Sequence, residues 1–341
     1  MTTQSTMHEY VKSKPSDEKK SDVYISDVAG PVVMPPLPDW NKPTTLREVV
    51  DQLGLYLNQD ATAEHKVHPL RYNADKRSYV AKIKWRKDGR DQSSRIVKLF
   101  DSASSEDYQH NYLTARDISG DWVPQLYTHR FNVPLGMRSL VMEDLSSSGR
   151  FSQKDQSMSE KLTSLIKAAE CLEFVHKYGG HGDVKSGNFM GSQNDVRIID
   201  FESFRSLDRL HLTPQYAAPE MMRMYGLRVK SQHEDLSRAE GDMLDLIESD
   251  FDARANDVYS FGVVVQRLLG NSNLLRKHRI MNKNDPLYEQ LIKLSSDPHG
   301  IYIPTGTNLH DLVSGMHDMN PKNRPSIFEV RRGLMDAKKK I

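Results

Sequence analysis

Two short segments carry residues whose types and spacing suit phosphoryl chemistry. The segment His181–Asn188 places Asp183, Lys185 and Asn188 on a predicted loop, and the apolar run that follows it ends at Asp200. A loop carboxylate can orient an attacking hydroxyl and accept its proton, and amide and carboxylate oxygens are ligands that Mg²⁺ prefers. Since phosphoryl transfer from ATP needs little else from a protein, these four side chains are candidate catalytic and metal-binding groups.

The order of the motifs along the chain is more specific than any one motif. The pattern Asp-x-Lys-x-x-Asn alone arises by chance at roughly one position in 8,000. Here Lys98 precedes it, on a predicted strand, and three further motifs follow: Thr213-Pro-Gln-Tyr-Ala-Ala-Pro-Glu220, Asp257-Val-Tyr-Ser-Phe-Gly262 and Arg324-Pro-Ser326. From about Lys66 to the C-terminus, this ordered set resembles the eukaryotic-type Ser/Thr protein kinase family.

The resemblance implies a role for each residue of the candidate centre. Asp183 would orient the substrate hydroxyl and accept its proton, and Lys185 would stabilise the transferring phosphoryl group. Lys98 would hold the α- and β-phosphates of ATP, and Asn188 and Asp200 would bind Mg²⁺. The implied cofactors are therefore ATP and Mg²⁺.

The resemblance also implies where the nucleotide lies. Met142–Leu145 would join the two lobes, with Met142 as gatekeeper and with backbone groups that hydrogen-bond the adenine edge. Lys82 and Lys84 are alternatives to Lys98, although only Lys98 follows the hairpin and precedes a predicted helix. The complete nucleotide-binding set is Lys98, Met142, Glu143, Leu145, Asn188, Met190 and Asp200.

The three downstream motifs imply a platform for a protein substrate. Thr213 is expected to hydrogen-bond near Asp183 and Lys185. Arg324 is expected to form a buried pair with Glu220, and Asp257-Val-Tyr-Ser-Phe-Gly262 would begin the buried helix that holds the catalytic loop. A protein is therefore the implied phosphoryl acceptor.

The sequence departs from the family pattern in four places. Glycine between the first two strands normally lets backbone amides approach phosphates closely, and an arginine in the catalytic loop normally recognises a phosphorylated loop. The four changes are the glycine-free segment Asn73–Ser78, Asn111 where a glutamate usually pairs with Lys98, Ile96 in place of a small alanine, and Gly182 with Glu202 in the two core motifs. Glu106 or Asp107 could replace the missing glutamate. The first three changes predict a weaker hold on the nucleotide, and the loss of the arginine at Gly182 predicts that loop phosphorylation is not the switch.

Two other functions remain open. A pseudokinase that acts only by binding proteins would explain the missing glycines, but it has no chemical need for the set of four candidate residues. A small-molecule phosphotransferase is the third possibility. His181-Gly-Asp183 and Ile199-Asp-Phe-Glu202 also resemble the aminoglycoside and choline phosphotransferases, which share the kinase fold.

Hydrophobic periodicity predicts an α+β fold with a small antiparallel-sheet N-lobe, one main N-lobe helix and a larger helical C-lobe. Strands are expected from Lys66 to Phe100 with a turn at Asp88-Gly89, and at 125–132 and 138–143. Helices are expected at 103–119, 159–176, 257–269, 286–294, 309–316 and 326–337. The predicted organisation is a disordered Pro-containing tail (1–42), an amphipathic helix (43–60) and a kinase domain (61–341, divided into 61–143 and 144–341). An acidic insertion at 227–254 is expected to be a solvated loop with a helical piece.

Composition limits the partners and the compartment. Lys plus Arg (47) nearly balance Asp plus Glu (46), so no basic field favours nucleic acid or an anionic membrane. The single cysteine, Cys171, is expected to be a buried thiol and excludes an internal disulfide framework. The sequence contains neither a secretory signal nor a transmembrane-length apolar stretch, which predicts a cytoplasmic protein or one exported by a non-classical route. The tail and the acidic insertion are candidate surfaces for a protein partner.

Overall fold

The computed structural model describes residues 42–57, 62–73, 77–101, 121–128, 137–149, 151, 156–201, 203–204, 213–269 and 308–341. The expected tail, except for Lys42, lies outside these residues, as do the expected helices at 103–119 and 286–294. The described part combines one main antiparallel sheet with several helices, which confirms the α+β class. Among the described helices, none has both the length and the apolar character that crossing a bilayer requires.

The main sheet has five antiparallel strands in the order β1-β2-β3-β5-β4. Its strands are β1 (Glu64–Asn73), β2 (Ser78–Lys87), β3 (Arg90–Asp101), β4 (Leu126–Thr128) and β5 (Met137–Glu143). The predicted turn joins β2 to β3, and both of its residues adopt the left-handed conformation, with φ of 51° at Asp88 and 74° at Gly89. Two such residues in a row match the twist of a hairpin, so the Asp-Gly signal predicted the turn correctly.

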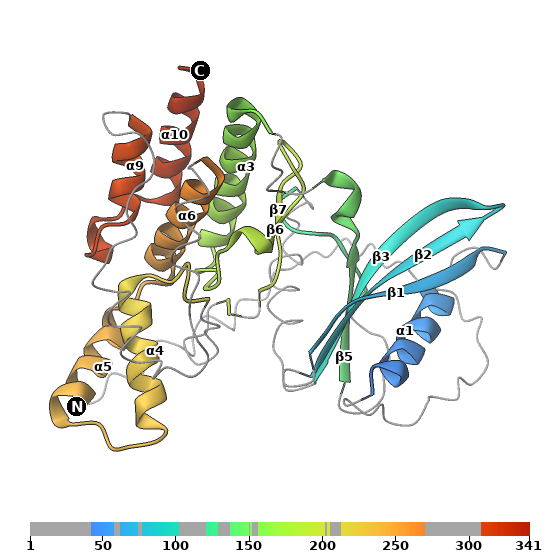
Figure 1. Ribbon diagram of the computed structural model, residues 1–341, viewed down its shortest axis with the longest axis horizontal. Coiled ribbons are helices and arrows are strands. Elements are labelled where there is room, and N and C mark those ends of the chain that lie inside the picture. The colour runs from blue at the N-terminus through green and yellow to red at the C-terminus, as the bar shows by residue number, and fades with distance from the viewer. Residues whose placement is uncertain are drawn as a thin grey trace, which may run out of the picture. The chain divides into compact units, whose positions relative to one another are not determined.

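Alternation along β2 divides the sheet into two faces. Tyr79, Ala81, Ile83 and Trp85 are buried, and the residues between them are half-buried. The helix α1 (Pro43–Leu57) lies against β1 and β2 (Figure 1). It covers the buried face with apolar residues at helical spacing, namely Leu46, Val49, Val50 and Leu53. Lys82 and Lys98 lie on the opposite face of the sheet, which is therefore the face that presents polar side chains.

The helical part has its own core. Its helices are α3 (Met158–His176), α4 (Pro219–Ser231), α5 (Arg238–Asp250), α6 (Ala253–Leu269), α9 (Asn308–Met316) and α10 (Ile327–Lys338). Short elements complete it: η2 (Leu145–Ser148), η3 (Ser186–Asn188), β6 (Phe189–Met190), β7 (Arg197–Ile198) and η5 (Pro321–Asn323). Capping boxes begin α3 at Ser157 and α10 at Ser326, because each serine is followed three residues later by glutamate. The predicted helices at 159–176, 257–269, 309–316 and 326–337 therefore differ from the observed ones only at their ends.

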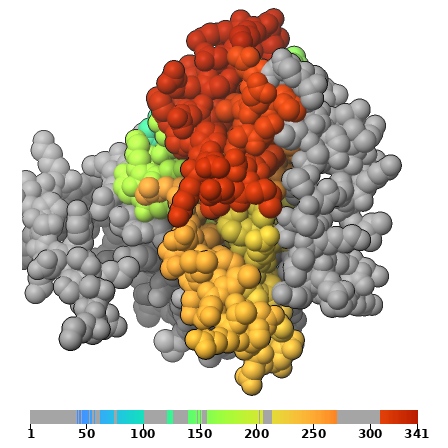
Figure 2. All heavy atoms as spheres, turned by 90° about the vertical axis from the view of Figure 1, so that its left-hand side faces the viewer, coloured from blue at the N-terminus to red at the C-terminus, as the bar shows by residue number. Residues whose placement is uncertain are grey.

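The acidic segment 227–254 is more regular than the sequence suggested. Its central part is the 13-residue helix α5, which begins with a capping box at Ser237. Leu244 and Ile247 pack against the buried methionines of α4, and two ion pairs, Arg228 to Glu248 and Lys230 to Glu240, join the helices. Figure 2 shows α5 (orange) at the surface below α9 and α10 (red). The segment is thus mainly a packed helix, because its apolar side chains pack against α4 and two of its acidic side chains form ion pairs with α4.

Candidate active site

The loop His181–Asn188 is held in place by one buried carboxylate of α6. Asp257 Oδ2 accepts from the backbone N–H of His181 at 2.6 Å, and Oδ1 accepts from the N–H of Gly182 at 2.9 Å. Its side chain is fully buried, and His176 Nε2 at the end of α3 lies 3.1 Å away. The prediction that the Asp257 helix holds this loop is therefore confirmed.

Asp183, Lys185 and Thr213 form a compact polar triangle. Thr213 Oγ1 donates to Asp183 Oδ1 at 2.8 Å, and Lys185 Nζ donates to Asp183 Oδ2 and, at 3.3 Å, to Thr213 Oγ1. The expected position of Thr213 is thus confirmed. Asp183 is 8% exposed, so its carboxylate has limited contact with water and lies beside the amino group of Lys185. Such a group can accept a proton from a hydroxyl while the ammonium stabilises negative charge.

Asn188 is oriented by the same loop. Its Nδ2 donates to the backbone oxygen of Asp183 at 2.9 Å, and the residue is 3% exposed. Since both amide hydrogens belong to Nδ2, this contact leaves the side-chain oxygen as the atom for a cation. The hydrogen bond from Ile199 N to Asn188 O, at 2.9 Å, brings the segment before Asp200 beside the loop.

Asp200, in the helical part of the chain, forms an ion pair with Lys98 of strand β3. Lys98 Nζ lies 3.4 Å from Asp200 Oδ1, and the two side chains are 16% and 27% exposed. Burial acts to raise the pKa of Asp200, but the charges of Lys98, then Lys185, hold that pKa below its ordinary value. The backbone of Asp200 has a φ of 70°, which is uncommon for a residue other than glycine. Backbone strain of this kind clusters at functional sites.

The three candidate lysines have different partners. Lys82 Nζ contacts the carboxylate of Asp144, and Lys84 Nζ lies 3.8 Å from Asp91 Oδ2. Of the three, Lys98 is the one that the structure places beside Asp200. Lys98 is therefore better placed than Lys82 or Lys84 to bind the phosphates of a nucleotide.

The segment Met142–Leu145 ends β5 and begins η2. Met142 lies opposite Ile96, so the bulkier residue at 96 adjoins the expected gatekeeper. The N–H of Glu143 already donates to Gln125 O at 2.9 Å, whereas Leu145 is the first residue of η2, where helical N–H groups lack intrahelical partners. The amide of Leu145 is thus better suited to a base than that of Glu143. Met190 lies on β6 opposite Arg197 and is half-buried.

The expected Arg324–Glu220 pair is present and is bidentate. Arg324 Nη1 and Nη2 donate to the two carboxylate oxygens of Glu220 at 2.6 and 2.8 Å, and the arginine side chain is fully buried. Tyr216 OH lies 2.9 Å from Ser186 Oγ, which connects the segment before α4 to the loop His181–Asn188. These contacts confirm the predicted pairing and connect the segment before α4 to the loop that carries Asp183.

Some residues of the sequence analysis lie outside the described part of the chain, among them Glu106, Asp107, Asn111 and Glu202. Conversely, the sequence did not indicate two ion pairs at the end of β5, Asp144 with Lys82 and Glu143 with Arg197. No local signal could have found them, because neither pair has a characteristic spacing.

Oxygen donors are available for a cation at the centre, and they fit Mg²⁺. Within the described residues, no group of three or more His, Cys, Asp or Glu side chains is placed to hold a metal. A magnesium ion at the centre would have Asn188 and Asp200 as its protein ligands, with its remaining ligands from phosphate and water, which is usual for this ion.

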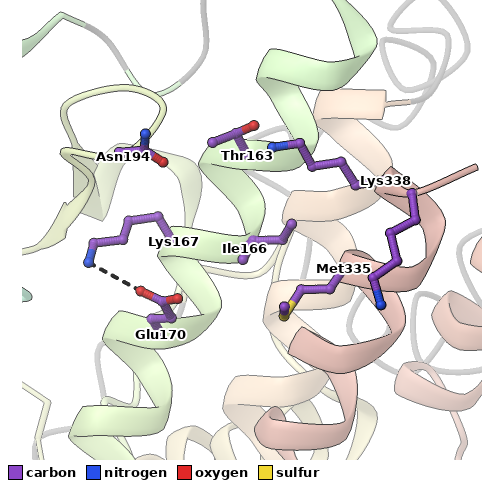
Figure 3. Close-up of a pocket in the computed structure, with 8 residues that line it drawn as sticks. Thr163, Ile166, Lys167, Glu170, Asn194, Met335 and Lys338 are labelled. Atoms are coloured by element: carbon purple, nitrogen blue, oxygen red, sulfur yellow. Dashed lines mark hydrogen bonds and ion pairs between the residues drawn. The ribbon is translucent and has the colours of Figure 1, made fainter. Parts of the chain in front are cut away.

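A separate pocket of about 490 Å³ lies between α3 and the end of α10 (Figure 3). Lys167, Lys338 and Lys339 line it together with Ile166 and Met335. Two of the three lysines already pair with carboxylates, Lys167 with Glu170 and Lys339 with Asp336. The pocket contains none of the candidate catalytic residues, and we assign it no ligand.

Comparison with known proteins does not assign this arrangement to a class: no family model matches the chain, and no curated protein matches it.

Proposed function

We propose that the chain has a two-lobed protein-kinase-like fold and transfers the γ-phosphoryl group of ATP to Ser or Thr hydroxyls of proteins. The observation that carries this proposal is the triangle of Asp183, Lys185 and Thr213, with Asn188 bonded to Asp183 and the Lys98–Asp200 pair nearby. Lys98 comes from the sheet, and the other five residues come from the helical part of the chain. Chance does not readily explain why residue types with matching chemistry come together from segments so distant in sequence.

The reaction assigns one task to each group. The substrate oxygen forms a bond to the γ-phosphorus, the bond from that phosphorus to the β,γ-bridging oxygen breaks, and ADP leaves. Asp183 orients the hydroxyl and accepts its proton, while Lys185 stabilises negative charge on the transferring group. Lys98 positions the phosphates. Mg²⁺, held by Asn188 and Asp200, would neutralise phosphate charge.

The hydrogen bond from Thr213 to Asp183 favours a protein over a small alcohol as the acceptor of the phosphoryl group. Thr213 belongs to a segment that continues through Tyr216 and Glu220 into the buried Arg324 pair. An extended platform of this kind suits a peptide, whereas a small molecule needs only a pocket.

The test is transfer of labelled γ-phosphate from Mg-ATP to the protein itself and to generic protein substrates. Asp183→Asn should lower the rate by about 10² to 10⁴-fold, the usual contribution of a positioned base. Lys98→Met should also abolish most transfer, and Lys84→Met, on the neighbouring strand, should not. Transfer to small alcohols or aminoglycosides alone would favour the small-molecule phosphotransferase. Binding without any transfer would favour the pseudokinase.

A further inference from the structure

Asp144, the residue that follows β5, is held to two strands of the sheet and to η2. Its carboxylate contacts Lys82 Nζ from β2, accepts from Ser94 Oγ of β3 at 2.5 Å, and accepts from the backbone N–H of Ser146 at 3.0 Å. Lys82 Nζ also donates to Ser146 Oγ at 2.6 Å. The side chains of Asp144 and Lys82 are 3% and 16% exposed, so the pair is shielded from water.

Glu143, the preceding residue, is held to other elements. Its carboxylate contacts Arg197 of β7 and accepts from Gln125 N at 3.2 Å, while its own N–H donates to Gln125 O at 2.9 Å. Arg197 is 16% exposed and also pairs with Asp195 at 3.2 Å. The side chains of two consecutive residues thus have different partners: Asp144 is bonded to β2, β3 and Ser146, and Glu143 to Arg197 of β7 and to Gln125.

Lys82 lies on the same face of the sheet as Lys98. In the strand register, Lys82 is opposite Ile96, and Val80 is opposite Lys98, so the two lysines stand in adjacent rows. Yet the ammonium of Lys82 is already bonded to residues 144 and 146, on either side of Leu145. Lys82 therefore lies beside residues 143–145, the proposed base-binding segment, and not beside the proposed position of the ATP phosphates.

We propose that these contacts form a hinge brace, defined as Lys82, Ser94, Asp144, Glu143 and Arg197, and that Lys82 is a positioning residue for the nucleotide base. This inference rests on the proposed ATP-dependent function. The brace fixes the backbone of residues 143–145 before the nucleotide arrives, so that binding requires less ordering of this segment. A rigid base-binding segment would compensate for the glycine-free segment Asn73–Ser78 at the phosphate end.

Removal of Lys82 should loosen the segment for an electrostatic reason. Asp144 would keep its negative charge in a shielded position without its cation, which is strongly unfavourable. The carboxylate would turn toward water, and residues 144–148 would move with it. The amide of Leu145 would then no longer be preset for the base.

The test compares Lys82→Met with Arg86→Met, a matched control on the same strand. Arg86 pairs with Asp91 at 2.7 Å, but both side chains are more than half exposed. Lys82→Met should raise the KM for ATP about tenfold and change kcat less than about twofold, because it alters binding and not the chemical step. Asp144→Asn added to Lys82→Met should raise KM no further, since the two residues act as a unit. Arg86→Met should leave both parameters unchanged.

Hydrogen exchange of residues 143–148 in the nucleotide-free protein provides a readout that does not depend on activity. Lys82→Met should speed this exchange and Arg86→Met should not; equal rates in the two variants would overturn the brace. Faster exchange with an unchanged KM would overturn the positioning role. If the parent protein fails to bind Mg-ATP, the proposed function fails with it, yet the exchange comparison still decides whether the brace exists. Should Lys82→Met not fold, Ser94→Ala removes one hydrogen bond and should raise KM about two- to threefold.

Discussion

Thr213 and Asp183, 30 positions apart in the chain, are joined by a hydrogen bond of 2.8 Å from Oγ1 to Oδ1. The bond connects the segment that leads into α4 with the loop that α6 holds through Asp257. Lys185 contacts both residues, so the threonine helps to orient the carboxylate and the ammonium together.

The first prediction concerns this bond. Thr213→Val retains the shape of the side chain but removes the hydroxyl, so Asp183 loses a donor. We expect kcat to fall about 10- to 100-fold with the KM for ATP unchanged, since a hydrogen bond to a charged group contributes about 1.5–3 kcal/mol. Thr213→Ser keeps the hydroxyl and should retain most activity. Steady-state kinetics with saturating protein substrate measures both, and equal losses in the two variants would contradict this role.

The second prediction concerns the buried Arg324–Glu220 pair. Arg324→Met would leave Glu220 without its bidentate partner, and we expect the free energy of unfolding to fall by about 3–5 kcal/mol. The control is Lys339→Met, which breaks an exposed pair with Asp336 and should cost less than about 1 kcal/mol. Urea denaturation followed by circular dichroism gives both values. Similar losses would show that burial does not matter here.

The third prediction concerns Gly182, at the position where the resemblance to protein kinases implies an arginine. Its φ of 84° lies in the left-handed region, where a side chain costs about 1–2 kcal/mol. Gly182→Ala should therefore lower the free energy of unfolding by about that amount. Gly187→Ala is the control, because a methyl group there meets no atom within 4 Å. The idea fails if the two variants are equally stable in denaturant titrations.

The fourth prediction concerns the pH dependence of the free energy of unfolding that Asp144 causes. Burial acts to raise its pKa, but the bonds from Lys82, Ser94 and Ser146 lower it from 3.8 to about 2. A carboxyl group with a lowered folded-state pKa contributes stability above its unfolded pKa and loses it as the pH falls through the folded value. The contribution, about 2 kcal/mol, should thus disappear between about pH 4 and pH 2.

Denaturant titrations of the parent protein and of Asp144→Asn at several pH values measure this contribution. The stability difference between the two proteins should be largest at neutral pH and should shrink as the pH falls toward 2. A difference that stays constant over this range would contradict the lowered pKa.

The fifth prediction concerns Cys171. Burial raises the pKa of its thiol to about 12, and Sγ lies 3.2 Å from the backbone oxygen of Val196. The native protein should therefore react with a thiol reagent only as fast as it unfolds, because thiolate is the reactive form. Mass spectrometry after brief labelling, with and without denaturant, checks this. Rapid labelling of the native protein would show that the thiol is accessible.

Local structure followed from local patterns. The alternation of β2, the Asp88-Gly89 turn and the serine-glutamate capping boxes each depend on residues only a few positions apart, so the printed sequence contains the whole signal. The Asp183, Lys185 and Asn188 spacing belongs to the same class, since one loop carries all three. In α5, Ser237 and Glu240 form the same kind of capping box, although the segment 227–254 is expected from its acidic composition to be a solvated loop with a helical piece.

The sequence by itself determined the α+β class, the positions of most described elements and the set of candidate residues for phosphoryl chemistry. The order of the elements favoured Lys98 over Lys82 and Lys84, but only the tertiary structure showed that Lys98 contacts Asp200, because this contact joins residues 102 positions apart. The tertiary structure also decided that Lys82 pairs with Asp144 and Glu143 with Arg197. These partners are separated by 50 or more positions, and their meeting depends on how the strands and helices pack and not on any pattern within either segment.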